Sequence, residues 1–513
     1  MWNPIQISSL LVSVLVVTLV SLPDNNAFAG TQCALAATSS ANGARSVPQT
    51  CSNRPSINIR SQSAFSSAMR NLRCGDAIYL ANGVYSGNFD IKEHCHSQPV
   101  VISGTCSQDV RFKGKLNISG SGIIVSGLKT SSNTFIISGD NNKIEHNYIN
   151  GGSGVGILLH RGASNNVIAN NEISRLGSYG IWTKLSRSDK KVAKNNQILG
   201  NYIHDFVADS GNAAEAIQIG PGATTTKWDT NSLIKGNLIE RVSVDMEIIS
   251  LKASGNRVIG NTFRNSKAYV SFRHGMNNIF SKNYVDITHG VRVLGDNHQI
   301  IGNTVRGNIY IMSGDITQAQ KASGHQGHPY SLNAVVNGNI AEVIDVGYAY
   351  STPPRYPAKA RSVTGNNADV RVTNGATGAR SGRQRASVAA IIPLTRAQVG
   401  PNGGGGEVGC TANGAGGDPS VDTSSAAPSE MTQASSISAP QNSGSGSGSG
   451  SSSSDLAKLK EDLRIAENRL NIAQSRYRQG RIPAKNVSNR EADVAAAKAA
   501  LQAAQSGNAS YPE

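Results

Sequence analysis

The hexapeptide IEHNYI at 144–149 decides the fold, because its pattern returns repeatedly downstream. Each copy has an apolar residue, two further residues, an asparagine, one more residue and a second apolar residue. The later copies read IANNEI at 168–173, ILGNYI at 198–203, IKGNLI at 234–239, VIGNTF at 258–263, FSKNYV at 280–285 and IIGNTV at 300–305. Successive asparagines are 24, 30, 36, 24, 22 and 20 residues apart. A recurring period of this length is typical of a solenoid.

Short alternating runs between the copies, such as 216–219 and 268–272, indicate two or three strands in each repeat and no helix. This pattern predicts an all-β fold, a right-handed parallel β-helix whose coils stack about 4.8 Å apart. We expect the asparagine to adopt a left-handed conformation at a fixed turn and to form a ladder of amides. Leucine-rich repeats share the period, but leucine is not the recurring apolar residue here.

The N-terminal region predicts export. An apolar run at 10–22 precedes Ala27-Phe28-Ala29, and together they resemble a signal peptide over residues 1–29. No Lys or Arg precedes the run, which leaves an uncleaved membrane anchor as the alternative. We expect a secreted or periplasmic protein with no transmembrane span in the mature chain. Five of the six cysteines fall early in the chain and predict disulfides there, while one stands alone: Cys33, Cys51, Cys74, Cys95 and Cys106, and then Cys410.

Composition divides the remainder into three parts. Residues 30–400 are predicted to form the β-helix domain, with a serine-capped helix at 63–72 covering its first coil and an irregular basic segment at 353–400. The Gly/Ser-rich stretch 401–454 predicts a flexible linker. Apolar residues three and four apart at 455–506 predict a coiled-coil-like α-helical hairpin. We expect the hairpin to oligomerise or attach the protein to a surface, although an inert, self-packed hairpin fits equally well.

The charge balance indicates the kind of partner. Lys and Arg number 48 against 33 Asp and Glu, a net charge of +15. A basic chain attracts a polyanion. Because this chain is expected outside the cytoplasm, an acidic polysaccharide is the predicted partner, and nucleic acid is not.

Chemistry-bearing residues concentrate in VDMEIISLKASGN at 244–256 and SFRHG at 271–275. Asp245 and Glu247 are two apart, so a strand places both carboxylates on one face. Paired acids favour a shared cation, and hard oxygen ligands suit calcium. Lys252 belongs to the same coil, and Arg273 follows 21 residues later, close to one coil. A solvated ladder of charges on the outside of the solenoid is the alternative interpretation.

These residues carry a resemblance to a known family. The run EIISLKAS at 247–254, with Asn256, NTF at 261–263 and RHG at 273–275, resembles the signature of polysaccharide lyase family 6, which includes alginate lyases and chondroitinase B. The segment NAAEAIQIG at 212–220 is similar to the family's preceding segment, which normally reads Asn-Gly-x-Glu-Thr-Ile. The likeness spans roughly residues 74–303.

The resemblance implies calcium-assisted β-elimination on a uronic acid polymer. It assigns Lys252 as the base that removes the C5 proton and Arg273 as the group beside the glycosidic oxygen. Because an arginine is rarely deprotonated, we expect Arg273 to stabilise the leaving oxygen electrostatically. The family suggests alginate as the substrate, with dermatan sulfate (chondroitin sulfate B) also possible.

The resemblance also implies the metal ligands. Calcium would be held by Asp245, Glu247 and an upstream residue, most simply Asn212. Asp245 stands where the family usually has Glu, and alanines surround Asn212. The sequence therefore leaves open whether Asn212 or Glu215 supplies the third ligand.

Two further residues are candidate substrate contacts. His274 adjoins Arg273, and Arg292 lies 19 residues beyond Arg273, near the next coil. A buried structural His274 and a solvated Arg292 are the alternatives. Two other functions fit the same sequence: a mannuronan C5-epimerase, and a non-catalytic β-helix that binds acidic glycans.

Overall fold

The computed structural model describes residues 56–104, 110–160, 162–184, 191–206, 214–220, 228–350, 352–402 and single positions between 463 and 502. The expected signal peptide at 1–29 lies outside these residues, as does almost all of the expected linker. So do Asn212 and four of the cysteines: Cys33, Cys51, Cys106 and Cys410.

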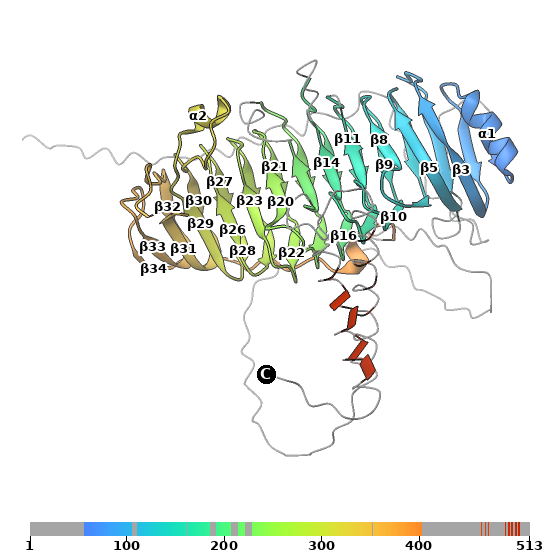
Figure 1. The fold of residues 1–513 in the computed structure, drawn as a ribbon. Coiled ribbons are helices and arrows are strands. Elements are labelled where there is room, and N and C mark those ends of the chain that lie inside the picture. The colour runs from blue at the N-terminus through green and yellow to red at the C-terminus, as the bar shows by residue number, and fades with distance from the viewer. Residues whose placement is uncertain are drawn as a thin grey trace, which may run out of the picture.

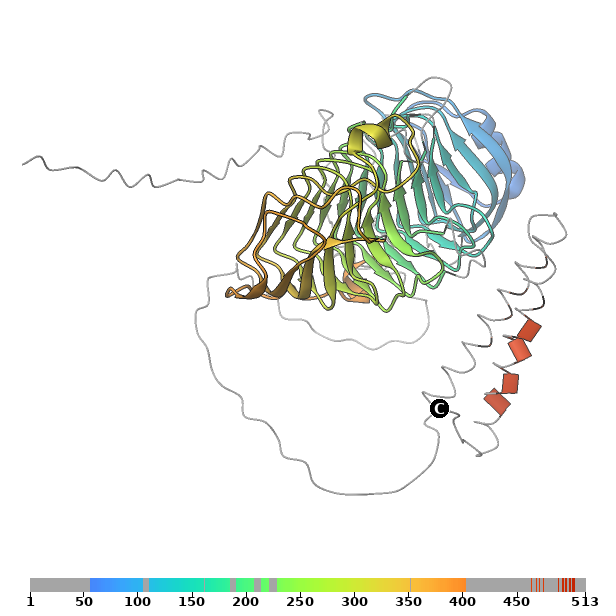
Figure 2. The same cartoon turned by 60° about the vertical axis from the view of Figure 1, so that its left-hand side comes forward.

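The described chain winds into stacked coils of parallel strands, which confirms the predicted parallel β-helix (Figure 1). A view turned toward its C-terminal end shows the coils stacked behind one another (Figure 2). One wall is a 13-stranded sheet. Its strands are β1 (Ile57–Ile59), β2 (Ala77–Leu80), β4 (Val100–Gly104), β6 (Ile123–Ser126), β9 (Lys143–Glu145), β12 (Val167–Ala169), β15 (Gln197–Leu199), β18 (Leu233–Lys235), β21 (Arg257–Ile259), β24 (Ile279–Ser281), β27 (Gln299–Ile301), β30 (Val335–Asn337) and β32 (Ser362–Thr364).

The other walls form two columns of strands. The second column contains β7 (Lys129–Thr130), β10 (Tyr148–Asn150), β13 (Glu172–Ser174), β16 (Tyr202–His204), β19 (Leu238–Glu240), β22 (Thr262–Arg264), β25 (Tyr284–Asp286) and β28 (Thr304–Val305). The third contains β8 (Phe135–Ile137), β11 (Ile157–Leu159), β14 (Ile181–Thr183), β17 (Ile217–Ile219), β20 (Glu247–Leu251), β23 (Tyr269–Phe272), β26 (Val291–Val293) and β29 (Asn308–Met312). Longer strands join these columns at the two ends: β3 (Gly83–Ile91), β5 (Val110–Ile118), β31 (Ile340–Tyr348), β33 (Asn367–Val372) and β34 (Gly382–Arg385).

The repeated asparagine builds the turn between the first two walls. Asn201 is fully buried; its backbone N–H donates to Asn237 Oδ1 at 2.8 Å, and its Nδ2 donates to the same oxygen at 3.0 Å. The same bonding recurs through Asn339 to Asn366, beyond the copies read from the sequence. The predicted ladder is therefore confirmed.

The expected conformation of the ladder asparagine is wrong, because the left-handed residue is the one before it. Asn170 precedes Asn171 with φ +52°, and Gly200 precedes Asn201 with φ +58°. The turn needs one left-handed residue, and placing it there leaves the next amide free to point along the stack.

A helix closes the first coil. The helix α1 (Gln62–Arg70) begins after Ser61, whose hydroxyl accepts from the Ala64 backbone N–H at 3.2 Å. The expected serine cap is thus present, with the helix starting one residue earlier than predicted. Phe65 packs its ring edge-on against several aromatic rings of the first coils. A disulfide joins Cys74 to Cys95.

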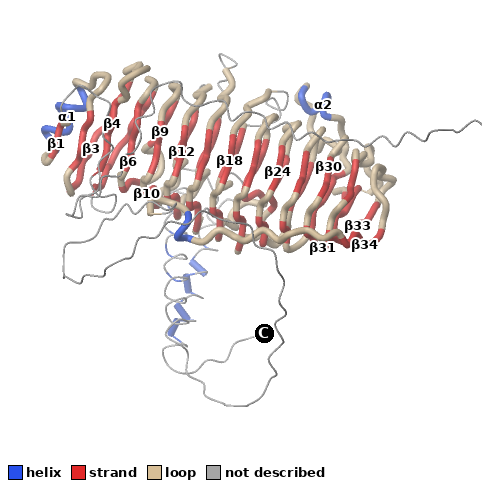
Figure 3. The backbone as a smooth tube through the Cα atoms, turned by 180° about the vertical axis from the view of Figure 1, so that it is seen from behind, coloured by secondary structure: helices blue, strands red, loops and turns tan. Residues whose placement is uncertain are grey.

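The basic segment 353–400 was expected to be irregular, which is wrong for its first part, because β32, β33 and β34 lie within it. Its last part, 386–400, which we call the C-terminal strap, is irregular as expected apart from a short 3-10 helix at Arg396–Gln398. The strap runs back along the outside of the second column, from β34 toward β10 (Figure 3). The Leu394 backbone N–H donates to Thr262 Oγ1 at 2.7 Å, and the Gly400 N–H donates to the Gly200 carbonyl at 2.8 Å. Val399 is fully buried against Tyr202. The strap therefore ties several coils together.

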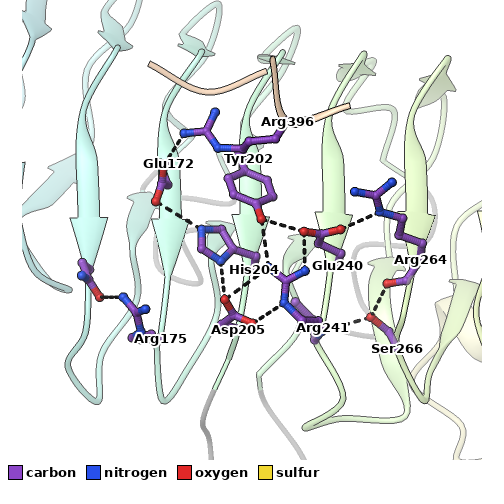
Figure 4. A network of polar contacts seen from close by, with 12 residues as sticks. Glu172, Arg175, Tyr202, His204, Asp205, Glu240, Arg241, Arg264, Ser266 and Arg396 are labelled. Carbon is purple, nitrogen blue, oxygen red and sulfur yellow. Dashed lines mark hydrogen bonds and ion pairs between the residues drawn. The ribbon is translucent and has the colours of Figure 1, made fainter. Parts of the chain in front are cut away.

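A polar network under the strap fixes its end (Figure 4). The Arg396 guanidinium lies 4.6 Å from the Tyr202 ring centroid and donates to Glu172 Oε2 at 2.5 Å. The His204 imidazole lies between two acids, with Nδ1 2.7 Å from Asp205 Oδ2 and Nε2 3.3 Å from Glu172 Oε1. Burial alone would lower the pKa of His204, but its hydrogen bonds to these acids outweigh burial and raise the pKa above its ordinary value.

The described positions of the predicted C-terminal hairpin are helical, among them Leu463, Leu470 and Val494. Lys498 Nζ lies 3.4 Å from Glu467 Oε1, which links the two predicted arms. Among the described residues, no helix is both long enough and apolar enough to cross a membrane.

Candidate active site

The site lies on the third column of strands. Because the strands pair in register, their outward-facing residues form one line along the solenoid. This line consists of Trp182, Gln218, Ser250, Ser271, Arg292 and Tyr310, one residue from each successive coil. The third column therefore carries one ordered row of side chains along the solenoid.

Lys252 follows β20 directly and is mostly buried. Its Nζ donates to Gln218 Oε1 at 2.7 Å and lies 3.3 Å from Glu215 Oε1. Gln218 Nε2 donates to the Gly220 carbonyl at 2.9 Å, which turns the amide oxygen toward the lysine. The preceding coil thus orients the Lys252 amine from two sides.

Arg273 lies beside Lys252, as the spacing predicted. Its backbone N–H donates to the Leu251 carbonyl at 3.0 Å, so the two residues occupy neighbouring coils. The Arg273 Nη1 donates to Glu247 Oε1 at 2.8 Å. The lysine and the arginine therefore flank one stretch of the outer surface.

Glu247 is the most heavily bonded acid of the site. Its Oε1 accepts from Arg273, from Arg292 Nη2 and from Ser271 Oγ. Burial would raise the pKa of Glu247, but the charges of Arg273 and Arg292 outweigh burial and hold it below its ordinary value. Asp245 lies just before this strand, and its Oδ1 accepts from the Glu247 backbone N–H at 3.3 Å.

The pKa of Glu215 is shifted upward, in the opposite direction from that of Glu247. Burial raises its pKa to about 7; Lys252 opposes that shift, and the negative charges of Asp245 and Glu247 add to it. Its Oε2 is buried and has no hydrogen-bond partner among the described residues.

The donor set partly fits a hard cation such as calcium. It offers the carboxylates of Asp245 and Glu247, two residues apart in the sequence, and one orphaned buried oxygen, on Glu215. However, Glu247 Oε1 and Glu215 Oε1 are already taken by protein cations, and within the described ranges no three His, Cys, Asp or Glu side chains converge on one point. An ion there would need Asp245 and Glu247 together with a further ligand such as Asn212, which lies outside the described residues.

Arg292 is neither solvated nor directed at open solvent. It is 2% exposed and donates to Ser271 Oγ, Glu247 and the Tyr350 hydroxyl. Its guanidinium carbon lies 4.7 Å from the Tyr269 ring centroid. These contacts make Arg292 a positioning residue for Glu247.

His274 is buried under an excursion that carries α2 (Gln318–Ala322). Gln318 Nε2 donates to the His274 carbonyl at 2.5 Å. Burial lowers the pKa of His274 to about 2, and the nearby charges of Lys321 and Arg273 lower it further, so the imidazole is neutral. Its Nδ1 is a buried atom without a hydrogen-bond partner in the described part of the chain.

Some residues of the site were not anticipated from the sequence. Gln218 was missed because a glutamine on a strand has no chemical signature until its coil is placed beside Lys252. Tyr179 was also missed: its ring stacks on Trp182 with centroids 4.5 Å apart. Burial, and then the charges of Glu215, Asp245 and Glu247, raise the pKa of the Tyr179 hydroxyl well above its usual range.

Comparison with known proteins finds a family that matches the part of the chain that carries the candidate active site. Residues 128–323, which contain Lys252, Arg273 and the acids Glu215, Asp245 and Glu247, match the family model of chondroitinase B. The resemblance to polysaccharide lyase family 6 is confirmed. No curated protein matches the chain.

Solved structures of family 6 share the fold. The alginate lyase AlyGC is 18% identical with a TM-score of 0.55; the match covers 64% of this chain and 50% of AlyGC. A family 6 polysaccharide lyase from Pseudopedobacter saltans is 18% identical with a TM-score of 0.56, covering 67% of this chain and 99% of its own. A mannuronic-acid-specific family 6 lyase from human gut microbiota is 18% identical with a TM-score of 0.54, covering 63% and 85%. This chain therefore spans about half the length of AlyGC, and at these identities the likeness shows the β-helix alone.

Proposed function

We propose that the protein is an exported, calcium-dependent polysaccharide lyase that cleaves a uronic-acid polymer by β-elimination, with alginate as the first substrate to test and dermatan sulfate as the second. The observation that carries the proposal is the placement of Lys252 and Arg273 on neighbouring coils, beside the buried acid Glu247, within the stretch that matches chondroitinase B.

In this mechanism the Lys252 amine takes the C5 proton of the uronate. The electrons of the broken C5–H bond form a double bond between C4 and C5, and the C4–O bond breaks. The departing glycosidic oxygen keeps the bonding pair and is stabilised by Arg273 until it takes up a proton. Gln218 and Glu215 orient the amine, and Arg292 with Ser271 orients Glu247.

The C5 proton is a weak acid because its removal places a second negative charge next to the substrate carboxylate. Calcium, when bound, would withdraw that charge from the carboxylate. Asp245, Glu247 and Asn212 are the residues we assign to hold it, with Glu215 as the alternative to Asn212.

The direct test is ultraviolet absorbance, because the new C4–C5 double bond is conjugated with the carboxylate. Full-length protein is incubated with polymannuronate, polyguluronate and dermatan sulfate, with calcium, with EGTA, and with calcium restored after EGTA. We expect absorbance to rise with at least one polymer, to stop rising in EGTA and to recover with calcium. No rise with any polymer contradicts the lyase, and a rise that ignores EGTA contradicts the calcium assignment alone.

A further inference from the structure

The excursion that carries α2 reaches back over the coils toward the proposed active site. It spans residues 313–331, between β29 and the next coil, and α2 stands out from the stacked coils (Figure 2). Its two ends pair with each other. The Asp315 backbone N–H donates to the His328 carbonyl at 3.0 Å, and the Tyr330 N–H donates to the Ile316 carbonyl at 3.1 Å. The excursion is therefore a closed loop with a defined conformation.

Two polar side chains of α2 are buried. Gln318 is 4% exposed and Lys321 is 6% exposed. Lys321 Nζ donates to the Gly327 carbonyl at 2.8 Å, so this side chain holds the excursion together. Gln318 instead reaches beyond the excursion, because its Nε2 donates to the His274 carbonyl at 2.5 Å. Gln318 thus connects the excursion to the residue that follows Arg273.

The coil between the two partners leaves room for this contact. Gly295 has φ +94°. A Cβ at this position would lie 2.6 Å from the Gly275 carbonyl oxygen and 3.0 Å from Gln318 Oε1. A larger residue would therefore displace the Gly275 backbone and crowd the Gln318 amide, so a glycine at 295 is what admits the glutamine.

The peptide Arg273-His274-Gly275, which we call the arginine turn, packs tightly beside Lys252. Its three backbone N–H groups all donate to the Leu251 carbonyl, at 3.0, 3.2 and 3.4 Å in chain order. Leu251 directly precedes Lys252. A Cβ on Gly275 would lie 1.9 Å from the Ala253 carbonyl oxygen, so the turn closely approaches the backbone on the other side of the lysine as well. Backbone contacts therefore fix Arg273 relative to Lys252.

Gln318 holds the arginine turn through its remaining backbone group. A carbonyl oxygen only accepts, so the amide presents Nε2 to His274. The Gln318 Oε1 is a buried atom that has no hydrogen-bond partner within the described ranges. The turn is thus bound at its N–H groups by Leu251 and at a carbonyl by Gln318, and a shift of the turn would lose one of these bonds.

We propose that Gln318 is a positioning residue for the reaction: it holds the arginine turn against Leu251 and thereby keeps the Arg273 guanidinium beside Lys252. The guanidinium itself is bound by Glu247, so Arg273 is held at both its backbone and its head group. Small displacements of a catalytic group are costly in rate. This inference rests on the proposed lyase function and adds to it a residue from outside the strands of the site.

The test removes the donor and keeps the shape of the side chain. Gln318→Met is made in the full chain, because methionine is close to glutamine in size and has no N–H, and Gln318→Leu is the second variant. With the polymer that the wild type cleaves, we expect kcat to fall about tenfold and KM to stay within about twofold, because a displaced Arg273 acts chiefly on the transition state. Gln299→Met, the same change at an exposed position of β27, is the matched control and should keep both wild-type values.

Hydrogen exchange measures whether the arginine turn itself loosens. Mass spectrometry of peptides that contain residues 273–275 reports the exchange of the three N–H groups that donate to Leu251. We expect these amides to exchange faster in Gln318→Met than in the wild type, and peptides from β3, at the other end of the solenoid, to exchange at the wild-type rate.

The two measurements together decide the proposal. A lower kcat with faster exchange at the arginine turn supports the positioning role. An unchanged kcat overturns it even if exchange is faster, because Gln318 would then be structural only. A lower kcat with unchanged exchange also overturns it, because the effect would not pass through the turn. If the wild type cleaves no polymer, the lyase proposal fails, and the exchange comparison alone decides whether Gln318 holds the turn.

Discussion

At the scale of single residues, the account depends on Lys252 being held ready for proton transfer. Its amine has an amide oxygen on one side and a buried carboxylate on the other, both contributed by the preceding coil. Such contacts fix the position of the nitrogen. Holding a catalytic group in the right place beside its substrate supplies a large part of the rate acceleration of an enzyme. The lysine acts on the substrate, whereas Gln218 and Glu215 act through the lysine.

We expect Lys252→Ala to lower kcat by at least about 100-fold, because no other group takes the C5 proton, while substrate affinity changes little. The measurement is the initial rate of absorbance increase, paired with calorimetric binding of an oligosaccharide. Lys235→Ala, an exposed lysine on the first wall, is the matched control and should retain the wild-type rate. A Lys252→Ala variant with an unchanged rate would remove the lysine from the mechanism.

Arg292→Ala should destabilise the protein by about 3–5 kcal/mol, because it leaves the buried Glu247 carboxylate with one guanidinium instead of two. Urea unfolding measures the loss, and Arg257→Ala on the exposed face of β21 is the control.

The pH dependence of that loss has a defined sign. The pKa of Glu247 is lowered in the folded protein, so its contribution to stability is present above the ordinary value of 4.5 and disappears as the pH falls through the folded pKa. The difference between the wild type and Arg292→Ala should therefore shrink below about pH 4.5. A difference that grows on acidification would contradict the assigned pairing.

At the scale of elements, the C-terminal strap contacts several coils at once, and these contacts are not part of the repeat. Strands in a β-helix contact only their neighbours, so a segment that crosses several coils couples their stabilities. The strap does this through backbone N–H groups that donate to threonines of separate coils, Thr304 and Thr262, and through Arg396 on Glu172.

The attachment of the strap should weaken as the pH rises. The folded-state pKa of His204 lies above its ordinary value of 6.5, so the stability it contributes is complete below pH 6.5 and is lost as the pH rises through the folded pKa. We expect proteolysis within 386–400 to accelerate as the pH rises above 6.5 through the raised folded-state pKa of His204, as followed by mass spectrometry of the fragments. His204→Gln should lose this pH dependence, and an unaltered dependence in that variant would show that His204 is not its cause.

Elements with a repeating pattern could be predicted from the sequence, and the strap could not. The copies of the asparagine hexapeptide predict the coils because each copy makes the same bonds, as Asn171 and Asn201 do. The 21-residue interval likewise predicted that Arg273 would lie beside Lys252. The strap makes a different contact at each coil, so it has no period to detect.

The placement of Arg292 was also beyond sequence reasoning. Its spacing indicates the correct coil, but an arginine on an outward position is equally compatible with solvent. Only the folded chain brings Glu247 and Tyr350 to it and thereby buries it. Long-range partners decide such roles, and they are not encoded in local spacing.

At the scale of the whole molecule, the net charge of +15 should assist capture of a polyanion. Raising NaCl from about 0.05 M to 0.5 M shortens the Debye length from about 14 Å to about 4 Å. We expect KM for the polymer to rise at least about fivefold over that range, with kcat nearly constant.

Thermal unfolding at both salt concentrations controls for loss of structure. A KM that is independent of salt would indicate that contacts within the site, and not the overall field, hold the polymer.

The most direct measurement of the central claim is proton NMR of the polymer in D2O during turnover. The account predicts loss of the C5 proton together with a new vinyl C4 proton at the cleaved end, in wild-type protein and not in Lys252→Ala. Deuterium appearing at C5 in an uncleaved chain would contradict β-elimination and indicate epimerisation, and an unchanged C5 signal would contradict any proton abstraction at this site.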